Sequence, residues 1–421
     1  MKSAWLALCV RKRCRLGARD YAVVTAAYWG FTLTDGALRT LVLLHFYQLG
    51  YSPFTLALLF LLYEFAGIVA NLGGGWLAAR FGITRMLSIG IATQISGLLM
   101  LSALSPGWSE GLSVAWVVAA QGISGVAKDL TKTASKSAIK LTAAAGAGTL
   151  FSWAAWFTGS KNAMKGAGFF LGGALLGLAG FRPALWLMAG GLAVVLACVL
   201  LTLPPLLGKA KASRSAREFL AKSRGVNLLA AARITLFGAR DVWFVVGLPV
   251  FLYASSWTFA EIGAFLALWT IGYGLVQAAT PGLVRRSADG LSREVPAARA
   301  WTLGLAAVPA VLALVLALAP PARPDLVVAA GLGLFGVAFA VNSSLHSYLI
   351  LAYAGSEKTA EDVGFYYAAN AAGRLLGILL SGLLFQAAGL VGCLIGATTL
   401  LAVCWMTSLA LPVARVGPVA A

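Results

Sequence analysis

The most constraining feature of this sequence is a succession of long apolar runs separated by short polar connections. Each run has about twenty residues or more, the length that an α-helix needs to cross the hydrocarbon core of a bilayer. Twelve such runs can be marked, at residues 21–48, 53–79, 84–105, 112–134, 148–179, 183–205, 227–253, 259–282, 299–320, 325–353, 363–387 and 389–412. The sequence therefore predicts an all-α membrane protein with twelve membrane-spanning helices.

Composition and the spacing of the runs divide this chain into two halves. Only 11% of the residues are charged and 60% are hydrophobic, whereas an ordinary soluble domain is about 25% charged. The longest polar connection, 206–226, lies at the midpoint and has six runs on either side. We therefore predict six-helix bundles at 21–205 and 227–412, joined by a cytoplasmic linker and flanked by cytoplasmic tails at 1–20 and 413–421.

Basic residues gather in the N-terminal tail and in the connections that follow the second, sixth and eighth runs. They are Lys2, Arg11, Lys12, Arg13, Arg15, Arg19, Arg80, Arg85, Lys209, Lys211, Arg214, Arg217, Lys222, Arg224, Arg285, Arg286, Arg293 and Arg299. The alternate connections hold little beyond Arg182 and Arg323. This positive-inside pattern predicts that both termini lie in the cytoplasm, and we expect the protein in the inner membrane. It also accounts for most of the +18 net charge, so we expect no nucleic-acid partner.

The two halves contain short sequence echoes of one another. Residues 36–37 and 238–239 are both Gly-Ala, and residues 125–127 and 336–338 are both Gly-Val-Ala. Lys165 and Gly168 in the fifth run correspond to Arg374 and Gly377 in the eleventh. These echoes favour a duplication, and paired six-helix bundles are the architecture of major facilitator transporters. The substrate site of such transporters lies between the halves, near the bilayer midplane.

Twelve ionisable residues fall inside the apolar runs, where each costs about 2.5–3.5 kcal/mol at a helix centre. They are Asp35, Arg39, Glu64, Lys128, Asp129, Lys132, Lys161, Lys165, Arg233, Arg240, Asp241 and Arg374. Exposure of all of them to lipid would prevent insertion. We therefore predict that they face one another or a water-filled cavity, where they mark a substrate path.

Eight of these residues are basic and four are acidic, so the cavity carries an excess of four positive charges. A phosphate monoester carries about −1.5 to −2 at neutral pH, so the charge excess favours a small polyanion. The predicted anion-binding residues are Arg39, Lys128, Lys132, Lys161, Lys165, Arg240 and Arg374. The candidates for proton coupling or for holding the basic groups in place are Asp35, Glu64, Asp129 and Asp241.

Some of these residues also have structural interpretations. Asp35 and Arg39 have the i, i+4 spacing of a closed helical ion pair. Arg233 lies within two turns of a predicted cytoplasmic end, so its side chain could extend to the interface. The basic stripe 128–140 places a lysine at every fourth residue, and its last two members, Lys136 and Lys140, are expected at the cytoplasmic end.

The tenth run contains a polar segment, Asn342–Tyr348. Asn342 is a candidate for hydrogen bonding to substrate, and His346 for relaying a proton. The alternative is that this segment joins neighbouring helices through polar contacts. No Cys/His cluster, paired carboxylates or Ser/His/Asp arrangement is present, so we predict neither an enzyme nor a metal or cofactor site.

Residues 74–86, GGWLAARFGITRM, resemble the major facilitator signature between the second and third helices. Gly75, Leu77, Arg80 and Gly82 match that pattern, but Ala79 replaces its usual aspartate. Segments 28–53, 124–140, 158–176, 236–252, 340–350 and 362–377 resemble the organoarsenical efflux permeases of the ArsJ type. Those segments contain most of the twelve ionisable residues inside the apolar runs, which are called the deep ionisable residues below.

The resemblance implies export of 1-arseno-3-phosphoglycerate from the cytoplasm by alternating access. It also implies a partner glyceraldehyde-3-phosphate dehydrogenase, which makes this ester when arsenate replaces phosphate. The ester breaks down outside the cell, and the pair thereby confers arsenate resistance. The residues alone leave two alternatives, an organophosphate or sugar-phosphate exchanger and a non-transporting membrane sensor. A cationic-drug exporter is disfavoured by the net positive charge of the deep residues.

Overall fold

The computed structural model describes residues 18–142, 147–204, 222–284, 287, 290–354 and 359–413. Within these residues the regular elements are all helices, which confirms the predicted all-α class. The predicted tails and the linker 206–226 lie almost wholly outside the described residues, so their cytoplasmic location stays a prediction.

The N-terminal half contains seven helical segments that correspond to the first six predicted spans. They are α2 (Ala18–Gln48), α3 (Pro53–Leu58), α4 (Leu61–Phe81), α5 (Ile83–Ser102), α6 (Glu110–Thr142), α7 (Ala147–Ala179) and α8 (Phe181–Thr202). The second predicted span is divided into α3 and α4. Ser52 caps α3, because its side chain accepts a hydrogen bond from the backbone N–H of Thr55, and proline occupies the first helical position.

The C-terminal half repeats this plan. Its helices are α9 (Arg224–Phe244), α10 (Gly247–Ala254), α11 (Phe259–Leu283), α12 (Glu294–Leu318), α13 (Pro324–Tyr353) and α14 (Thr359–Leu409). The seventh span is divided into α9 and α10. The eleventh and twelfth spans form the two legs of α14, which the chain separates at Ala388 and Gly389. Gly389 has a φ of +61° and a ψ of −155°, a conformation that favours glycine.

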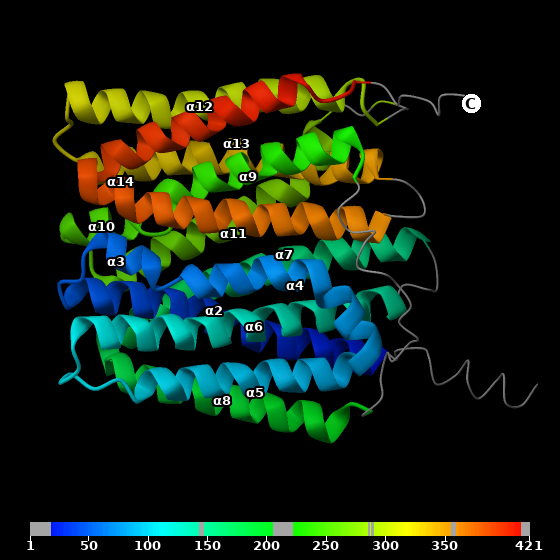
Figure 1. Cartoon of the computed structure of the whole chain (residues 1–421), viewed down its shortest axis with the longest axis vertical. Helices are drawn as coiled ribbons and strands as arrows, with labels where there is room; N and C mark the ends of the chain where they lie inside the picture. The colour runs from blue at the N-terminus through cyan, green and yellow to red at the C-terminus, as the bar shows by residue number, and fades with distance from the viewer. Residues whose placement is uncertain are drawn as a thin grey trace, which may run out of the picture.

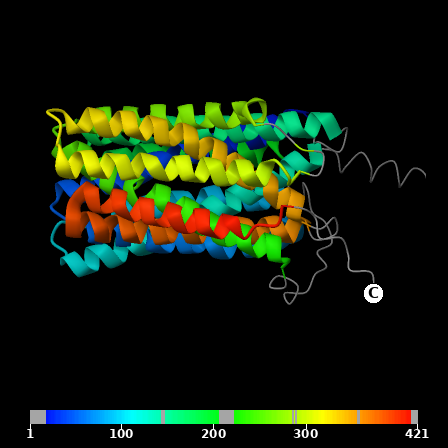
Figure 2. The same cartoon turned by 90° about the horizontal axis from the view of Figure 1, so that it is seen from above.

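The long helices lie nearly parallel in one bundle (Figures 1 and 2), and the first turn of α2 and the last turn of α14 lie at the same end (Figure 1). Nine segments of the described chain are long and apolar enough to cross a membrane, and one of them, Asp362–Leu409, contains both legs of α14. The helices α2 and α7, with 31 and 33 residues, complete the predicted twelve. The protein is therefore a multi-pass membrane protein.

The echoed glycines lie where helices pack closely in each half. A Cβ atom on Gly168 of α7 would come 2.3 Å from the carbonyl oxygen of Leu33 on α2. In the other half, a Cβ atom on Gly377 of α14 would come 2.6 Å from the carbonyl oxygen of Gly238 on α9. Small residues at such contacts let helix backbones approach closely in a bilayer. The sequence echo thus reflects the same helix pairing in both halves.

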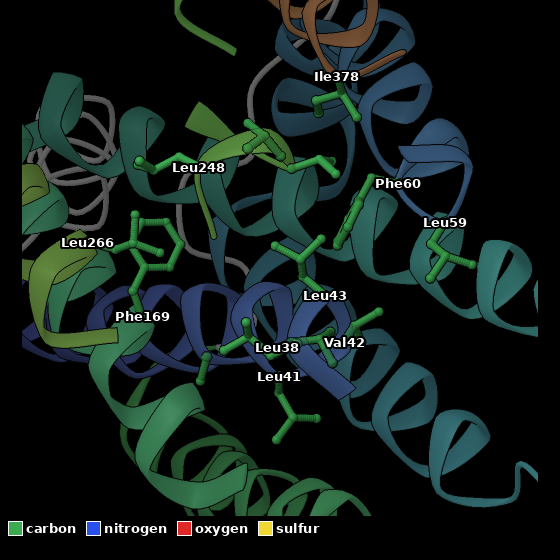
Figure 3. Close-up of a cluster of buried hydrophobic side chains, with 14 of the residues drawn as sticks. Leu38, Leu41, Val42, Leu43, Leu59, Phe60, Phe169, Leu248, Leu266 and Ile378 are labelled. Carbon is green, nitrogen blue, oxygen red and sulfur yellow. The ribbon is translucent and has the colours of Figure 1, made fainter. Parts of the chain in front are cut away.

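An apolar cluster joins the halves toward the end of the bundle where α2 ends. Figure 3 shows side chains of this cluster from both halves, namely Leu38, Leu41, Val42, Leu43, Leu59, Phe60, Phe169, Leu248, Leu266 and Ile378. At the same end, the rings of Tyr47 and Tyr253 meet edge to face with centroids 5.6 Å apart. These contacts pack the two halves against each other at that end.

Candidate functional site

A cavity of about 330 Å³ lies between the two halves, within the usual size range of small-ligand sites. Its walls come from α2, α4, α6 and α7 of the N-terminal half and from α9, α11, α13 and α14 of the other half. Leu43, Phe169 and Leu266 of the apolar cluster contribute to its lining. The cavity therefore occupies the position where the paired bundles predicted a substrate site.

All twelve of the deep ionisable residues line this cavity. The basic members are Arg39, Lys128, Lys132, Lys161, Lys165, Arg233, Arg240 and Arg374, and the acidic members are Asp35, Glu64, Asp129 and Asp241. The structure thus brings together the seven predicted anion-binding residues and the four predicted carboxylates. By formal charge, the lining carries four more positive than negative groups.

An ion-pair network crosses from one half to the other. Arg39 of α2 and Arg374 of α14 both donate to the same oxygen, Oε1, of Glu64 on α4. Arg374 Nε also lies 3.6 Å from Asp241 Oδ2, and Asp241 Oδ1 accepts a hydrogen bond of 2.6 Å from Arg240 Nε. Both carboxylates are fully buried, so removal of a basic partner would leave a costly buried charge.

A second group of charges lies on α6. Asp129 has Lys128 Nζ at 4.0 Å and Lys132 Nζ at 3.5 Å, so it partly compensates two ammonium groups. Lys132 Nζ also donates to Asn71 Oδ1 at 2.9 Å. Lys128 Nζ lies 3.8 Å from the ring centroid of Tyr63, in a cation–π arrangement. These contacts hold two lysines of the basic stripe 128–140 at the cavity wall.

Asp35 and Arg39 do not form the i, i+4 pair that their spacing allowed. The Asp35 carboxylate accepts a 2.5 Å hydrogen bond from the Tyr63 hydroxyl. Arg39 bonds to Glu64, and its guanidinium also lies over the rings of Phe60 and Tyr63. The tertiary structure therefore gives each residue a different partner across the helix interface.

Lys161 and Lys165 lie on the cavity-facing side of α7. The Lys165 ammonium lies 5.5 Å from the ring centroid of Phe169. Among the described residues, Lys165 has no carboxylate within ion-pair distance. The positive charges of Arg374, Arg39 and Arg240 repel Lys165 through Coulombic interactions, and the negative charge of Asp35 offsets part of that repulsion. An anion in the cavity would relieve this repulsion.

Arg233 is not among the predicted anion-binding residues, yet it lines the cavity and only 3% of it is exposed. Its guanidinium lies over the rings of Phe237 and Tyr366, at 4.1 and 4.8 Å, and donates to the Ser343 carbonyl oxygen at 3.1 Å. The helical spacing to Phe237, Arg240 and Asp241 could have revealed its orientation, since residues four, seven and eight apart share a helix face.

The polar segment of α13 divides between two directions. Ser343 and Ser347 line the cavity, whereas Asn342 and His346 are fully buried outside its lining. The Asn342 amide donates instead to Thr302 Oγ1 of α12 at 2.7 Å. Residues four apart share a helix face, whereas consecutive residues point about 100° apart. Ser343 and Ser347 therefore share one face of α13, and Asn342 and His346 share another. Asn342 and His346 therefore lie outside the lining of this cavity, and their roles in substrate contact and proton relay stay predictions.

Aromatic and amide side chains complete the lining, and the sequence did not single them out. Trp269 and Tyr273 stack with centroids 5.7 Å apart. Asn162 of α7 lies 3.5 Å from Gln277 of α11, which connects the two halves. Aromatic residues are common in this chain, so only their position in the fold shows which of them line the cavity. Among the described residues, no group of three His, Cys, Asp or Glu side chains could hold a metal ion.

Comparison with known proteins agrees with this geometry. The sequence profile of the Major Facilitator Superfamily matches residues 23–377, which is most of the chain. The chain belongs to the Major Facilitator Superfamily. As a member of this superfamily it is a membrane transporter, and its cavity lies where substrates bind in this architecture.

Solved transporter structures resemble this superfamily member over nearly their whole length. The nucleoside transporter NupG aligns with a TM-score of 0.71 at 16% identity, covering 92% of this chain and 98% of that one. A POT family transporter in complex with 5-aminolevulinic acid gives 0.73 at 13%, covering 93% and 95%. The human organic anion transporter MFSD10 gives 0.61 at 17%, covering 93% and 100%. At these identities the likeness shows the fold. No curated protein sequence matches the chain.

Two features of this transporter fall outside the described side chains. The signature-like segment includes residues 72–80 of α4, where the helix is described but the side chains are not. The same holds for Lys136 and Lys140 of the basic stripe 128–140. Their predicted location at a cytoplasmic end stays a prediction.

Proposed function

We propose that this transporter exports 1-arseno-3-phosphoglycerate from the cytoplasm and thereby confers arsenate resistance. The observation that supports this proposal most directly is the cavity between the halves, with its excess of four positive charges. A small polyanion would neutralise that excess, and it would also fit a cavity of about 330 Å³.

The chemistry of the lining suits oxyanion groups at both ends of such an ester. Arginine guanidinium groups bind phosphate-like oxyanions through two parallel hydrogen bonds, and lysines supply point charges. Arg240 and Arg374 come from the C-terminal half, whereas Arg39, Lys128 and Lys165 come from the N-terminal half. A substrate with two anionic groups would therefore contact both halves at once, as alternating access requires.

The sequence resemblance to organoarsenical efflux permeases favours the ester among possible polyanions. In the proposed pathway a glyceraldehyde-3-phosphate dehydrogenase supplies the ester in the cytoplasm, and the transporter lies in the inner membrane with both termini inside. An inside-negative potential favours export of a polyanion by about 2.3 kcal/mol per charge per 100 mV. Proton coupling is therefore compatible with export but is not required.

Everted membrane vesicles provide the direct test. The ester is generated outside the vesicles by the dehydrogenase with arsenate and glyceraldehyde 3-phosphate, and accumulated arsenic is measured with and without a proton gradient. We expect accumulation that depends on both the transporter and the dehydrogenase. Vesicles with Lys128→Ala serve as the inactive control. Accumulation of arsenic without the dehydrogenase would contradict the proposed substrate.

The second candidate is an organophosphate or sugar-phosphate exchanger. It is supported by Lys165 and Arg233, two cavity cations without a carboxylate partner among the described residues, because any phosphate ester could bind there. Exchange of radiolabelled 3-phosphoglycerate by the same vesicles would favour this candidate. Arsenate resistance that requires the dehydrogenase in growing cells would favour the organoarsenical instead.

A further inference from the structure

We infer that Glu64 is a built-in counter-ion that occupies an oxyanion subsite between Arg39 and Arg374. On binding, an oxyanion group of the substrate replaces the Glu64 carboxylate between these two guanidinium groups. This inference rests on the proposed function, since it assigns one anionic group of the substrate to a particular pair of arginines.

In this network the Glu64 carboxylate takes the position that a substrate oxyanion would occupy between the two arginines. A single carboxylate oxygen, Glu64 Oε1, accepts from one terminal nitrogen of each arginine. The other oxygen, Oε2, and the Nε atom of Arg39 are buried without a hydrogen-bond partner. Arg374 Nε lies 3.6 Å from Asp241 Oδ2, within ion-pair range but beyond hydrogen-bond distance. Arg39 and Arg374 thus retain donors that Glu64 does not use. A phosphoryl or arsenyl group has more acceptor oxygens, so it could engage each guanidinium through two nitrogens.

The two arginine side chains are more exposed than the Glu64 carboxylate. The side chains of Arg39 and Arg374 are 12% and 19% exposed, whereas that of Glu64 is 1% exposed. All three residues line the cavity. An anion in the cavity therefore has more of the arginine surface than of the carboxylate available to it, and it would compete with Glu64 for the guanidinium groups.

A displaced Glu64 carboxylate has another cation within its own half. Coulombic interactions link Glu64 to Lys128 as well as to the two arginines. Lys128 lies over the ring of Tyr63, the residue that precedes Glu64 in the chain. Transfer of the carboxylate from Arg374 toward Lys128 would keep it compensated, which a buried charge requires.

The exchange also concerns the contact between the halves. The Glu64–Arg374 pair joins α4 of the N-terminal half to the first leg of α14 in the C-terminal half. With Glu64 moved toward Lys128, the substrate oxyanion becomes the link between Arg39 and Arg374. A neutral or cationic compound cannot make this exchange, so the network selects for substrates with an oxyanion group.

Binding of defined oxyanions to the purified full-length transporter tests the inference. Inorganic phosphate and 3-phosphoglycerate are the probes, and isothermal titration in detergent gives their dissociation constants. Glu64→Gln removes the competing charge. We expect both probes to bind about ten- to a hundredfold more tightly, because in the wild-type protein the Glu64 carboxylate occupies the subsite most of the time and lowers the apparent affinity by that factor. Asp129→Asn is the matched control, because it raises the cavity charge equally without touching the arginine pair. We expect it to give a much smaller gain.

Glu64→Asp provides a second variant that keeps the charge. Its shorter side chain cannot reach both guanidinium groups, so we expect an intermediate gain in affinity. A Glu64→Gln gain no larger than that of Asp129→Asn, with the wild-type protein binding the probes, would overturn the inference and leave the proposed function standing. If wild-type and variant proteins bind none of the probes or the arsenate ester, both the inference and the proposed function fail.

Discussion

Replacement of Arg374 by methionine tests how much the network between the halves contributes to stability. Arg374 contacts two buried carboxylates, one from each half, Glu64 and Asp241. Methionine fills similar space but carries no charge. The substitution therefore leaves both carboxylates in a low-dielectric interior with less compensation.

The expected magnitude follows from the partners that remain. Removal of one member of a buried ion pair costs about 3–5 kcal/mol. After the loss of Arg374, Glu64 keeps Arg39 and Asp241 keeps Arg240. We therefore expect a cost near the lower end, about 3 kcal/mol in the free energy of unfolding.

A double-mutant cycle with Glu64→Gln separates this charge effect from lost packing. Arg39 keeps its contacts with the rings of Phe60 and Tyr63 when Glu64 is neutral. The double variant should therefore be more stable than the sum of the single effects, with a coupling energy of about 1–3 kcal/mol. Equilibrium unfolding in mixed detergent micelles, followed by circular dichroism, measures each corner of the cycle. An Arg374→Met variant within about 0.5 kcal/mol of wild type, or strictly additive costs, would refute the reasoning.

Three further predictions concern packing, binding and the residues outside the cavity. Gly168→Ala places a Cβ atom 2.3 Å from a carbonyl oxygen of α2 and should reduce the yield of monodisperse protein on size-exclusion chromatography. Gly190→Ala, where a Cβ atom meets nothing within 4 Å, should leave that yield unchanged, and equal yields would contradict the packing argument. Lys128→Ala and Arg240→Ala should each abolish arsenate resistance while the membrane level on immunoblots stays the same; normal growth of both variants on arsenate would refute their proposed anion-binding role. Asn342→Ala should lower stability by about 1 kcal/mol, through loss of one buried hydrogen bond, and should leave the vesicle KM for the ester unchanged. A raised KM would instead support the substrate contact that the sequence predicts for Asn342.

The sequence by itself determined the class of fold, the number of spans and the inventory of deep charges. The bilayer imposes strong local rules. A span needs about twenty apolar residues, and a charged side chain inside a span must face a partner or a water-filled cavity. For that reason the twelve deep ionisable residues could be identified from their positions within the apolar runs, and the fold places them all around one cavity. The echo of Gly168 and Gly377 likewise anticipated equivalent helix contacts in the two halves.

Only the tertiary structure decided which of those charges meet and which polar residues face the cavity. The pairing of Arg374 with Glu64 joins residues 310 positions apart, and no local pattern encodes such a contact. Likewise, Arg233 faces the cavity while Asn342 bonds to another helix, although both are polar residues within apolar runs. Helix rotation and the crossing of the two halves determine these directions, and both depend on packing across the whole bundle.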